Sequence, residues 1–260
     1  MKASFGTRGG HPFSAYSLTE WLASPRGQQL LEIEVSELRR VLPDLFGRSL
    51  LQIGNWGRGD ELIVQSEMLH HAVVGTLAGL GSQTVADPAS LPILDKSVDA
   101  VLLPHTLEFA TSPQDVLREV DRILTDRGRL LILGFNPWSL WGMRQLVGWR
   151  YRAFPGGARF QSVNRICDWL ELLGYEVSLV RRYGTGFPWS TGISLGEPGS
   201  LRSLLGPLLQ AYLIVAKKRV MPLTLMRLKR RAQVRPLIGA VGLPGAPTTM
   251  PDSSSLQPRE

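Results

Sequence analysis

The stretch VADPASLPILDKSVDAVLLPHTLEF, residues 85–109, decides the fold class of this chain of 260 residues. An acid, Asp87, follows a strand-like run, and a polar turn leads to Asp99, which opens a continuously apolar run. That run closes at residues 105–108, which read His-Thr-Leu-Glu. Apolar runs without polar alternation are typical of strands buried on both faces of a parallel sheet. The stretch therefore predicts a buried parallel strand with polar groups at its carboxyl end.

Strand-like and helix-like segments alternate on both sides of this stretch. Apolar runs predict strands at residues 49–54, 72–76, 83–86, 99–103, 129–135, 175–183 and 211–218. Helical spacing of apolar residues predicts helices at residues 18–42, 60–70, 113–124 and 162–173. This alternation indicates an α/β fold, with a doubly wound and mostly parallel sheet between helices on both faces.

Composition along the chain predicts three parts. Residues 1–47 form a helical segment that packs on the core through one apolar face, with Glu and Arg side chains on the other; the apolar residues are Leu30, Leu31, Ile33, Leu38 and Leu42. Residues 48–219 form the main domain, interrupted by a Gly/Pro/Ser-rich insertion at residues 184–207. Residues 220–260 hold a basic segment and a Pro/Ser-rich tail that we expect to be disordered.

Composition also excludes several classes of protein. The chain is 43% hydrophobic and 20% charged, which is ordinary globular usage. A single cysteine, Cys167, excludes a disulfide scaffold and a cysteine-based zinc site, and the four histidines show no metal-ligand spacing. No apolar stretch reaches the ~20 residues of a membrane-spanning helix, and the N-terminus lacks the apolar centre of a secretory signal. We therefore expect a cytoplasmic protein without a metal site.

The net charge of +7 is concentrated in one segment. Residues 217–235 hold eight Lys and Arg residues and no acid, so the remainder of the chain is nearly neutral. Three roles are open for this segment. It is a solvated tail, a helix that lies on an anionic membrane surface through its Met and Leu residues, or an RNA-binding element, which its lack of interleaved aromatic residues disfavours.

Ligands of open parallel sheets bind beyond the carboxyl ends of the strands. The segment LLQIGNWGRGDE, residues 50–61, places Gly54, Gly57 and Gly59 at such an end. Glycines let the backbone approach a ligand, and the helix predicted to follow would offer free N–H groups. Taken alone, the same spacing also suits a tight strand-to-helix turn.

Three further patterns complete a family resemblance. Residues 87–92 read Asp-x-x-x-Leu-Pro, residues 98–101 read Val-Asp-x-Val, and residues 118–128 read Arg-Glu-x-x-Arg-x-Leu-x-x-Arg-Gly. Together with the glycine turn, they resemble the class I S-adenosylmethionine-dependent methyltransferases of the type 11 group, over about residues 48–183. LLQIGNWGRG, LPHTLEF and GFNPWSLWG are similar to a bacterial branch of that group. The resemblance implies a Rossmann-like fold and methyl transfer from S-adenosylmethionine to a small-molecule acceptor.

The resemblance also implies contacts to the methionine part of the cofactor. Gly54, Gly57 and Gly59 would lie against it. Gln52 stands where the family has its first acid, and its side-chain carbonyl would bind the ammonium group.

For the adenosine part, the resemblance implies that Asp87 accepts a hydrogen bond from the adenine amino group, with Ala86 and Pro88 beside the ring. The alternative for Asp87 is a turn residue before a proline. The family's ribose-binding acid falls on Leu77, which cannot accept a hydrogen bond, so we expect weakened cofactor binding. The short segment between residues 74 and 84 also predicts that the usual crossover helix is missing there.

Two residues at the end of the strand at 99–103 are candidates for acid–base chemistry. His105 would face cofactor and substrate as a general base, because its ordinary pKa lies near physiological pH. Glu108 is the second candidate. The alternatives are a histidine bonded to a loop backbone and a solvated acid at a helix start.

Two functions from different classes therefore remain. The glycines, Asp87 and His105 favour an active methyltransferase. Gln52, Leu77 and the short crossover favour a non-catalytic relative that has lost or weakened its cofactor and binds partners instead. We expect the enzyme.

Overall fold

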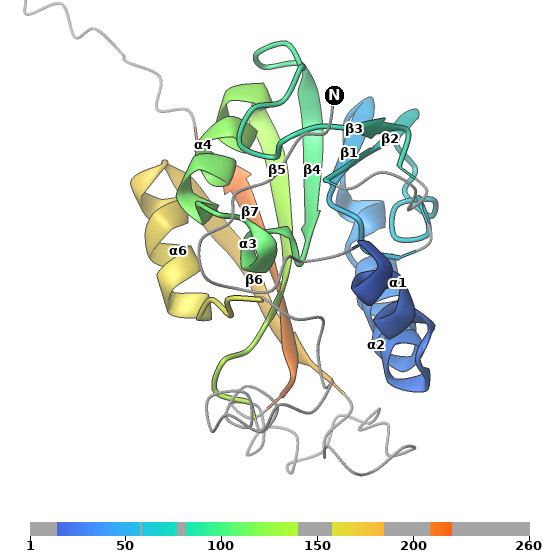
Figure 1. Cartoon of the computed structure of the whole chain (residues 1–260). Helices are drawn as coiled ribbons and strands as arrows, with labels where there is room; N and C mark the ends of the chain where they lie inside the picture. The colour runs from blue at the N-terminus through green and yellow to red at the C-terminus, as the bar shows by residue number, and fades with distance from the viewer. Residues whose placement is uncertain (1–14, 58, 77–81, 140–157, 185–208, 220–260) are drawn as a thin grey trace, which may run out of the picture. The chain divides into compact units, whose positions relative to one another are not determined.

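The computed structural model describes residues 15–57, 59–76, 82–139, 158–184 and 209–219 (Figure 1). In this part of the chain seven strands form one sheet in the order β3-β2-β1-β4-β5-β7-β6. The strands are β1 Ser49–Ile53, β2 His70–Gly75, β3 Thr84–Val85, β4 Val98–Pro104, β5 Leu124–Phe135, β6 Tyr175–Tyr183 and β7 Ala211–Lys218. Neighbours pair in parallel except β7, which is antiparallel to both β5 and β6. The sheet confirms the predicted α/β fold of the class I methyltransferase type.

Helices cover both faces of the sheet (Figure 1). They are α1 Ala15–Ala23, α2 Pro25–Arg39, the 3-10 turn Leu42–Asp44, α3 Thr106–Phe109, α4 Pro113–Ile123 and α6 Val163–Leu172. The serine hydroxyls of Ser24, Ser112 and Ser162 cap α2, α4 and α6 by accepting a hydrogen bond from a backbone N–H in the first turn. The cap predicted at Ser162 is therefore confirmed.

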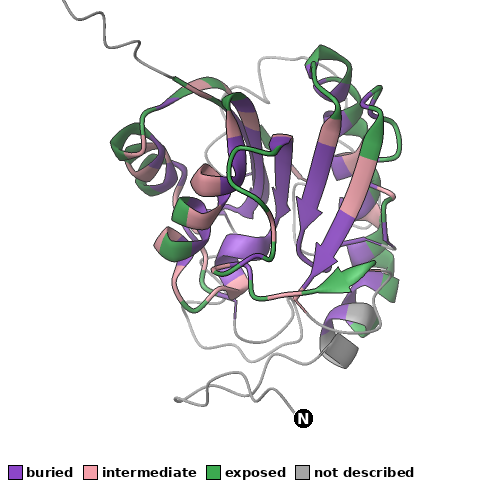
Figure 2. Ribbon diagram, turned by 90° about the horizontal axis from the view of Figure 1, so that it is seen from above, coloured by how far each residue is buried: buried purple, intermediate pink, exposed green. Residues whose placement is uncertain are grey.

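Two hydrophobic cores lie on opposite faces of the sheet because side chains alternate along each strand. On β4, Leu102 joins the core that contains Leu30 and Leu38 of α2. Its neighbour Leu103 joins the other core, which includes residues of α4 and α6, among them Val120 and Ile166. Figure 2 shows the central strands buried, whereas β3 at the sheet edge is exposed.

The helix predicted at residues 60–70 does not form, and the structure has turns at residues 61–65 instead. One helical turn begins, because the Val64 N–H donates to the Asp60 carbonyl at 2.8 Å. The hydroxyl of Ser66 then accepts a hydrogen bond from the Met68 N–H at 3.2 Å, a local bond that competes with helical pairing. Consequently no helix N-terminus follows the glycine turn.

Helix α2 buries a different set of residues from the predicted one. Glu34 and Glu37 are buried together with Leu30, Leu31 and Leu38. Glu34 lies four residues from both Leu30 and Leu38, and this spacing places all three side chains on one helical face. The prediction that the Glu side chains lie opposite the core was wrong for these two.

Several predictions lie outside the described residues. They concern Leu77, nearly all of the insertion at 184–207, and residues 220–260. Within the described residues, no helix is long and apolar enough to cross a membrane.

Candidate functional site

The carboxyl ends of the parallel strands β1, β2, β4 and β5 meet at one edge of the sheet. The glycine turn follows β1, Thr76 follows β2, His105 follows β4 and Asn136 follows β5. Ligands of this architecture bind at that edge.

The three glycines of the turn have backbone conformations that side chains rarely adopt. The φ angles are 120° at Gly54, 85° at Gly57 and 95° at Gly59. A Cβ atom at Gly54 would lie 2.4 Å from the hydroxyl oxygen of Thr106, whereas at Gly57 the nearest atom would lie 3.6 Å away. Gly54 therefore also lets the start of α3 pack closely, which the sequence did not indicate.

Gln52 lies fully buried beneath the glycine turn. Its side-chain nitrogen donates to the carbonyls of Trp56 at 3.1 Å and of Gly54 and Gly59 at 3.4 Å. Its side-chain oxygen is buried and has no hydrogen-bond partner among the described residues. A free buried acceptor fits the ammonium-binding role that the sequence implied, because a buried polar atom without a partner is costly.

Asn55 ties the glycine turn to the end of β2. Its side-chain oxygen accepts hydrogen bonds from the backbone N–H of Thr76 at 2.6 Å and from the Thr76 hydroxyl at 3.0 Å. Sequence reasoning missed this pair, because it gave no role to Asn55 within LLQIGNWGRG and none to Thr76. The pair fixes the point at which the chain leaves β2 toward Leu77.

Asp87 occupies an exposed turn at the end of β3. Its carboxylate accepts a hydrogen bond from the Ala89 N–H at 2.9 Å, and its carbonyl accepts one from Ser90 at 2.9 Å. The Ala86 N–H donates to the Gly75 carbonyl at 3.0 Å, and Pro88 is buried. These contacts are those of the turn residue weighed as the alternative, and the adenine role of Asp87 stays a prediction.

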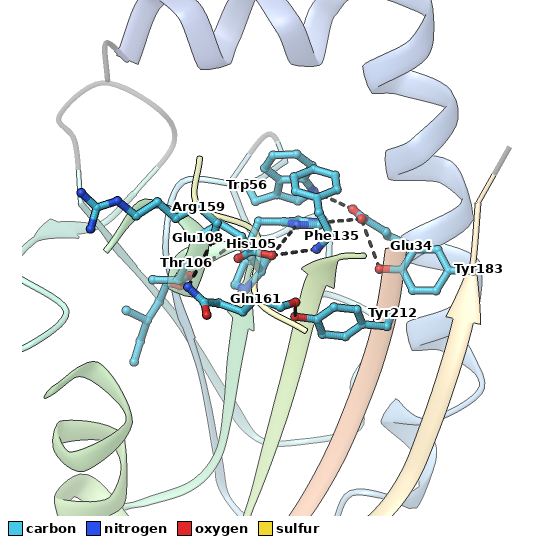
Figure 3. Close-up of polar contacts among 12 residues, drawn as sticks. Glu34, Trp56, His105, Thr106, Glu108, Phe135, Arg159, Gln161, Tyr183 and Tyr212 are labelled. Carbon is cyan, nitrogen blue, oxygen red and sulfur yellow. Dashed lines mark hydrogen bonds and ion pairs between the residues drawn. The ribbon is translucent and has the colours of Figure 1, made fainter. Parts of the chain in front are cut away.

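His105 is fully buried at the end of β4, and its φ of 53° is left-handed. Its Nε2 lies 2.7 Å from the Glu34 carboxylate (Figure 3). The ring also contacts two aromatic rings, with centroids 4.1 Å from Trp56 and 4.0 Å from Phe135. The alternative of a histidine bonded only to a loop backbone was wrong, because its partner is a carboxylate from α2.

Glu34 is a further residue that sequence reasoning missed. Its carboxylate accepts hydrogen bonds from Trp56 Nε1 at 2.5 Å and from the Tyr183 hydroxyl at 3.3 Å, in addition to its contact with His105 (Figure 3). The available signal was its position four residues from Leu30 and from Leu38, which places an acid on the apolar face.

Glu108 is buried on α3, so the alternative of a solvated acid was wrong. One carboxylate oxygen accepts the Phe135 N–H at 2.7 Å and lies 3.7 Å from Nδ1 of His105. The other oxygen is buried without a hydrogen-bond partner among the described residues. Figure 3 shows His105 between this carboxylate and that of Glu34.

The surroundings of His105 decide its charge. Burial disfavours the charged ring, but the carboxylates of Glu34 and Glu108 outweigh burial and raise the pKa of His105 to about 9. Burial and the same carboxylates hold the pKa of Tyr183 well above its usual range. A histidine that keeps its proton at neutral pH cannot accept one from a substrate. The charge state therefore argues against the general-base role expected for His105.

Asp99, in the second family pattern, lies at the opposite edge of the sheet. Its carboxylate accepts the backbone N–H groups of Arg48 at 2.8 Å and Ser49 at 3.2 Å. This residue joins β4 to the start of β1 and has a structural role.

The Arg-Glu-x-x-Arg pattern holds the loop between β3 and β4. Glu119 accepts the Leu91 N–H at 2.7 Å. Arg122 donates to the carbonyls of Ile93 at 2.9 Å and Leu91 at 3.1 Å, and pairs with Asp95. The pattern therefore fixes the loop that carries the Leu-Pro signature.

Comparisons with known proteins agree with this geometry. A family described as a methyltransferase domain matches residues 62–132. The chain is 37% identical over 224 residues to the uncharacterized protein YafS of Escherichia coli, covering 85% of this chain and 90% of that protein. It is 27% identical over 124 residues to the ubiquinone/menaquinone biosynthesis C-methyltransferase UbiE of Roseobacter denitrificans, about half of each chain (46% and 47%). In fold it is similar to an S-adenosylmethionine-dependent methyltransferase of Thermotoga maritima, with a TM-score of 0.58 and 18% identity, over 79% of this chain and 100% of that one.

Proposed function

Because this chain belongs to the class I S-adenosylmethionine-dependent methyltransferases of the type 11 group, we propose that it transfers a methyl group from S-adenosylmethionine to a small molecule. One observation carries the cofactor assignment. The buried side-chain oxygen of Gln52 lacks a partner among the described residues, and it lies beneath three glycines with positive φ angles at the carboxyl end of β1.

Methyl transfer from this cofactor does not require an acid or a base from the protein. The cofactor supplies both the methyl group and the leaving group, so the protein has to align the reactants and exclude water. Alignment alone supplies roughly 7–11 kcal/mol of the barrier. A protonated, buried His105 is compatible with such a reaction, because methyl displacement needs no general base at that position.

Two observations support a proposal for the chemical class of the methyl acceptor. UbiE is named for C-methylation in ubiquinone and menaquinone biosynthesis. The aromatic side chains of Trp21, Trp56 and Phe135 at the carboxyl edge form an apolar environment. Both observations support a small, hydrophobic acceptor, and we propose that the reaction takes place in the cytoplasm.

We further propose that the cofactor affinity is weaker than is usual for the family, because Leu77 replaces the ribose-binding acid. A lost hydrogen bond to a charged group costs about 1.5–3 kcal/mol.

Calorimetric titration with S-adenosylmethionine and with S-adenosylhomocysteine tests this function. We expect both to bind, with dissociation constants in the micromolar range or weaker. The matched control is Gly57→Val, which should fold and not bind, because a branched side chain at a φ of 85° forces the turn into another conformation. No binding by the natural protein would contradict the enzyme and support the non-catalytic alternative. Sub-micromolar binding would contradict the weak affinity alone.

For residues 217–235 we propose a separate role in binding polyanions. Lys217 is exposed. Lys218 and Arg219, by contrast, pair with Asp121 at 2.8 Å and Glu176 at 3.4 Å. The proposal therefore rests on Lys217 and on the cations beyond Arg219, which would bind an anionic membrane surface or RNA.

A further inference from the structure

The Glu34 side chain links helix α2 to the candidate cofactor edge by polar contacts. Glu34 accepts hydrogen bonds from Trp56 of the glycine turn and from Tyr183 at the end of β6, and pairs with His105 at the end of β4. All four side chains are buried. A helix that precedes the sheet in the sequence thus joins three elements at that edge.

The backbone at His105 is held in a conformation that costs free energy. Its left-handed φ of 53° is uncommon outside glycine and persists only where the surroundings enforce it. Here the ring contacts the rings of Trp56 and Phe135, and Glu34 holds its Nε2. The contact with Glu34 therefore fixes the direction in which the chain leaves β4.

We propose that Glu34 and His105 form a positioning pair, in which the ionic contact between them holds the glycine turn and the end of β4 in the arrangement that binds the cofactor. The pair acts through Trp56, whose Nε1 donates to Glu34 and whose ring lies tilted against that of His105. The inference rests on the proposed function, because it assigns a role to residues beside the proposed cofactor site. Neither residue is a catalytic residue in this proposal.

The charges around the pair make it sensitive to pH. The groups that face it are Glu108 of α3, Tyr183 of β6 and, one turn further along α2, Glu37, which itself pairs with Arg181. Protonated His105 lies between two carboxylates, which is why its pKa is raised. Loss of the proton leaves Glu34 and Glu108 as buried like charges around a neutral ring. The pair then loses its ionic contact.

The variant that tests the pair is Glu34→Gln, which keeps the size of the side chain and removes its charge. The matched control is Glu37→Gln, which removes the neighbouring buried carboxylate of the same helix. Glu37 contacts Arg40 and Arg181, and neither is in the glycine turn. Two measurements are made on each protein: the dissociation constant for S-adenosylhomocysteine, and hydrogen–deuterium exchange of a peptide that covers residues 52–62.

We expect Glu34→Gln to weaken S-adenosylhomocysteine binding roughly tenfold to a hundredfold, as for loss of a hydrogen bond to a charged group. Exchange in the peptide should become faster. Glu37→Gln should change neither quantity. Equal effects of the two variants, or no effect of Glu34→Gln on exchange, would overturn the proposal.

A second test varies the pH. The affinity of the natural protein for S-adenosylhomocysteine, measured from about pH 7 to about pH 10, should fall as His105 loses its proton, and should fall further than that of Glu34→Gln. The ligand's own ammonium group titrates with both proteins, so the difference between them reports on the pair, and an equal fall for both would overturn it. Imidazole nitrogen shifts in NMR spectra should show His105 losing its proton over the same range. A neutral His105 at about pH 7, or an affinity independent of pH, would overturn the pair.

Failure of the proposed function is a different result. A natural protein that does not bind S-adenosylhomocysteine contradicts the cofactor assignment. In that case the exchange of residues 52–62 and the NMR titration still decide whether the pair holds the glycine turn.

Discussion

The carboxylate of Glu34 lies 2.7 Å from Nε2 of His105, although 71 residues separate the two along the chain. Both side chains are fully buried. Breaking a buried ion pair by removing one partner is strongly destabilising, because it leaves an uncompensated charge. Stability and cofactor binding are therefore expected to depend on the protonation of one histidine.

The first prediction concerns stability and pH. The pKa of His105 in the folded protein is about 9, above the ordinary value near 6.5. Its contribution to stability is therefore fully present below about pH 6.5 and is lost as the pH rises through about 9. The contribution is on the order of 3 kcal/mol. Urea unfolding at several pH values should show this loss in the natural protein and not in His105→Gln. Parallel pH curves for the two proteins would contradict it.

The second prediction separates two glycines of the same turn. Gly54→Ala should destabilise the fold by about 1–3 kcal/mol for two reasons. The new Cβ would lie 2.4 Å from the Thr106 hydroxyl oxygen, and the positive φ at this position is unfavourable for alanine. Gly57→Ala has room for the Cβ and should cost only the backbone strain, roughly 1 kcal/mol. Denaturation midpoints of the two variants provide the comparison. A larger loss for Gly57→Ala would show that the turn packs differently.

The third prediction concerns the loop between β3 and β4. Arg122→Ala removes the donor to two loop carbonyls and should cost about 1–2 kcal/mol, with faster hydrogen exchange at residues 89–97. The control is Arg118→Ala on the same helix. Its ion pair with Asp115 is exposed, so it should change stability by less than about 0.5 kcal/mol. Similar effects of the two variants would contradict the role given to Arg122.

The fourth prediction concerns cofactor affinity. Leu77→Asp should tighten binding of S-adenosylhomocysteine, by roughly tenfold or more, because it restores a charged acceptor for the ribose hydroxyls. Leu77→Asn is the matched control, since it has a similar shape without the charge, and should give a smaller gain. Calorimetric titration of the three proteins measures the order. A gain that is equal for both variants, or absent, would argue that residue 77 does not face the ribose.

The fifth prediction concerns the basic segment. Reversing the charge of Lys229, Arg230 and Arg231 together should reduce retention on anionic vesicles or on RNA and leave S-adenosylhomocysteine affinity unchanged. Retention of the natural protein should also fall steeply with salt, because exposed charges and counterion release carry it. Co-sedimentation with each polyanion at two salt concentrations distinguishes membrane from RNA. Absence of retention at low salt would contradict polyanion binding and favour the interpretation of this segment as a solvated tail.

The sequence by itself determined which segments form the strands of the sheet and where the helices α4 and α6 lie along the chain. Buried parallel strands require continuous apolar runs, and α4 and α6 require apolar residues at helical spacing with a capping residue in front. These are local properties, so the strands from β1 to β7 and the cap at Ser162 were found within a few residues of their observed bounds. The glycines that follow β1 were also visible, because a positive φ favours a residue without a side chain.

The spacing of apolar residues gave a wrong prediction where a hydrogen bond from a side chain to the backbone competes with helical pairing. Residues 60–70 have apolar residues suited to a helix, but the bond between the Ser66 hydroxyl and the Met68 N–H competes with helical pairing after one turn. The turn residue Asp87 shows the same competition between a side chain and the backbone.

The tertiary structure alone decided which polar residues are buried together. The spacing of Glu34 from Leu30 and Leu38 places it on the apolar face of its helix, but no spacing in the sequence relates it to His105 or Glu108. Packing of α2 on the sheet takes Glu34 out of water. It then needs donors, and it finds them in Trp56, His105 and Tyr183, which come from three other elements. The charge of His105 follows from the same packing, because a pKa depends on the neighbours that folding provides and not on the residue type alone.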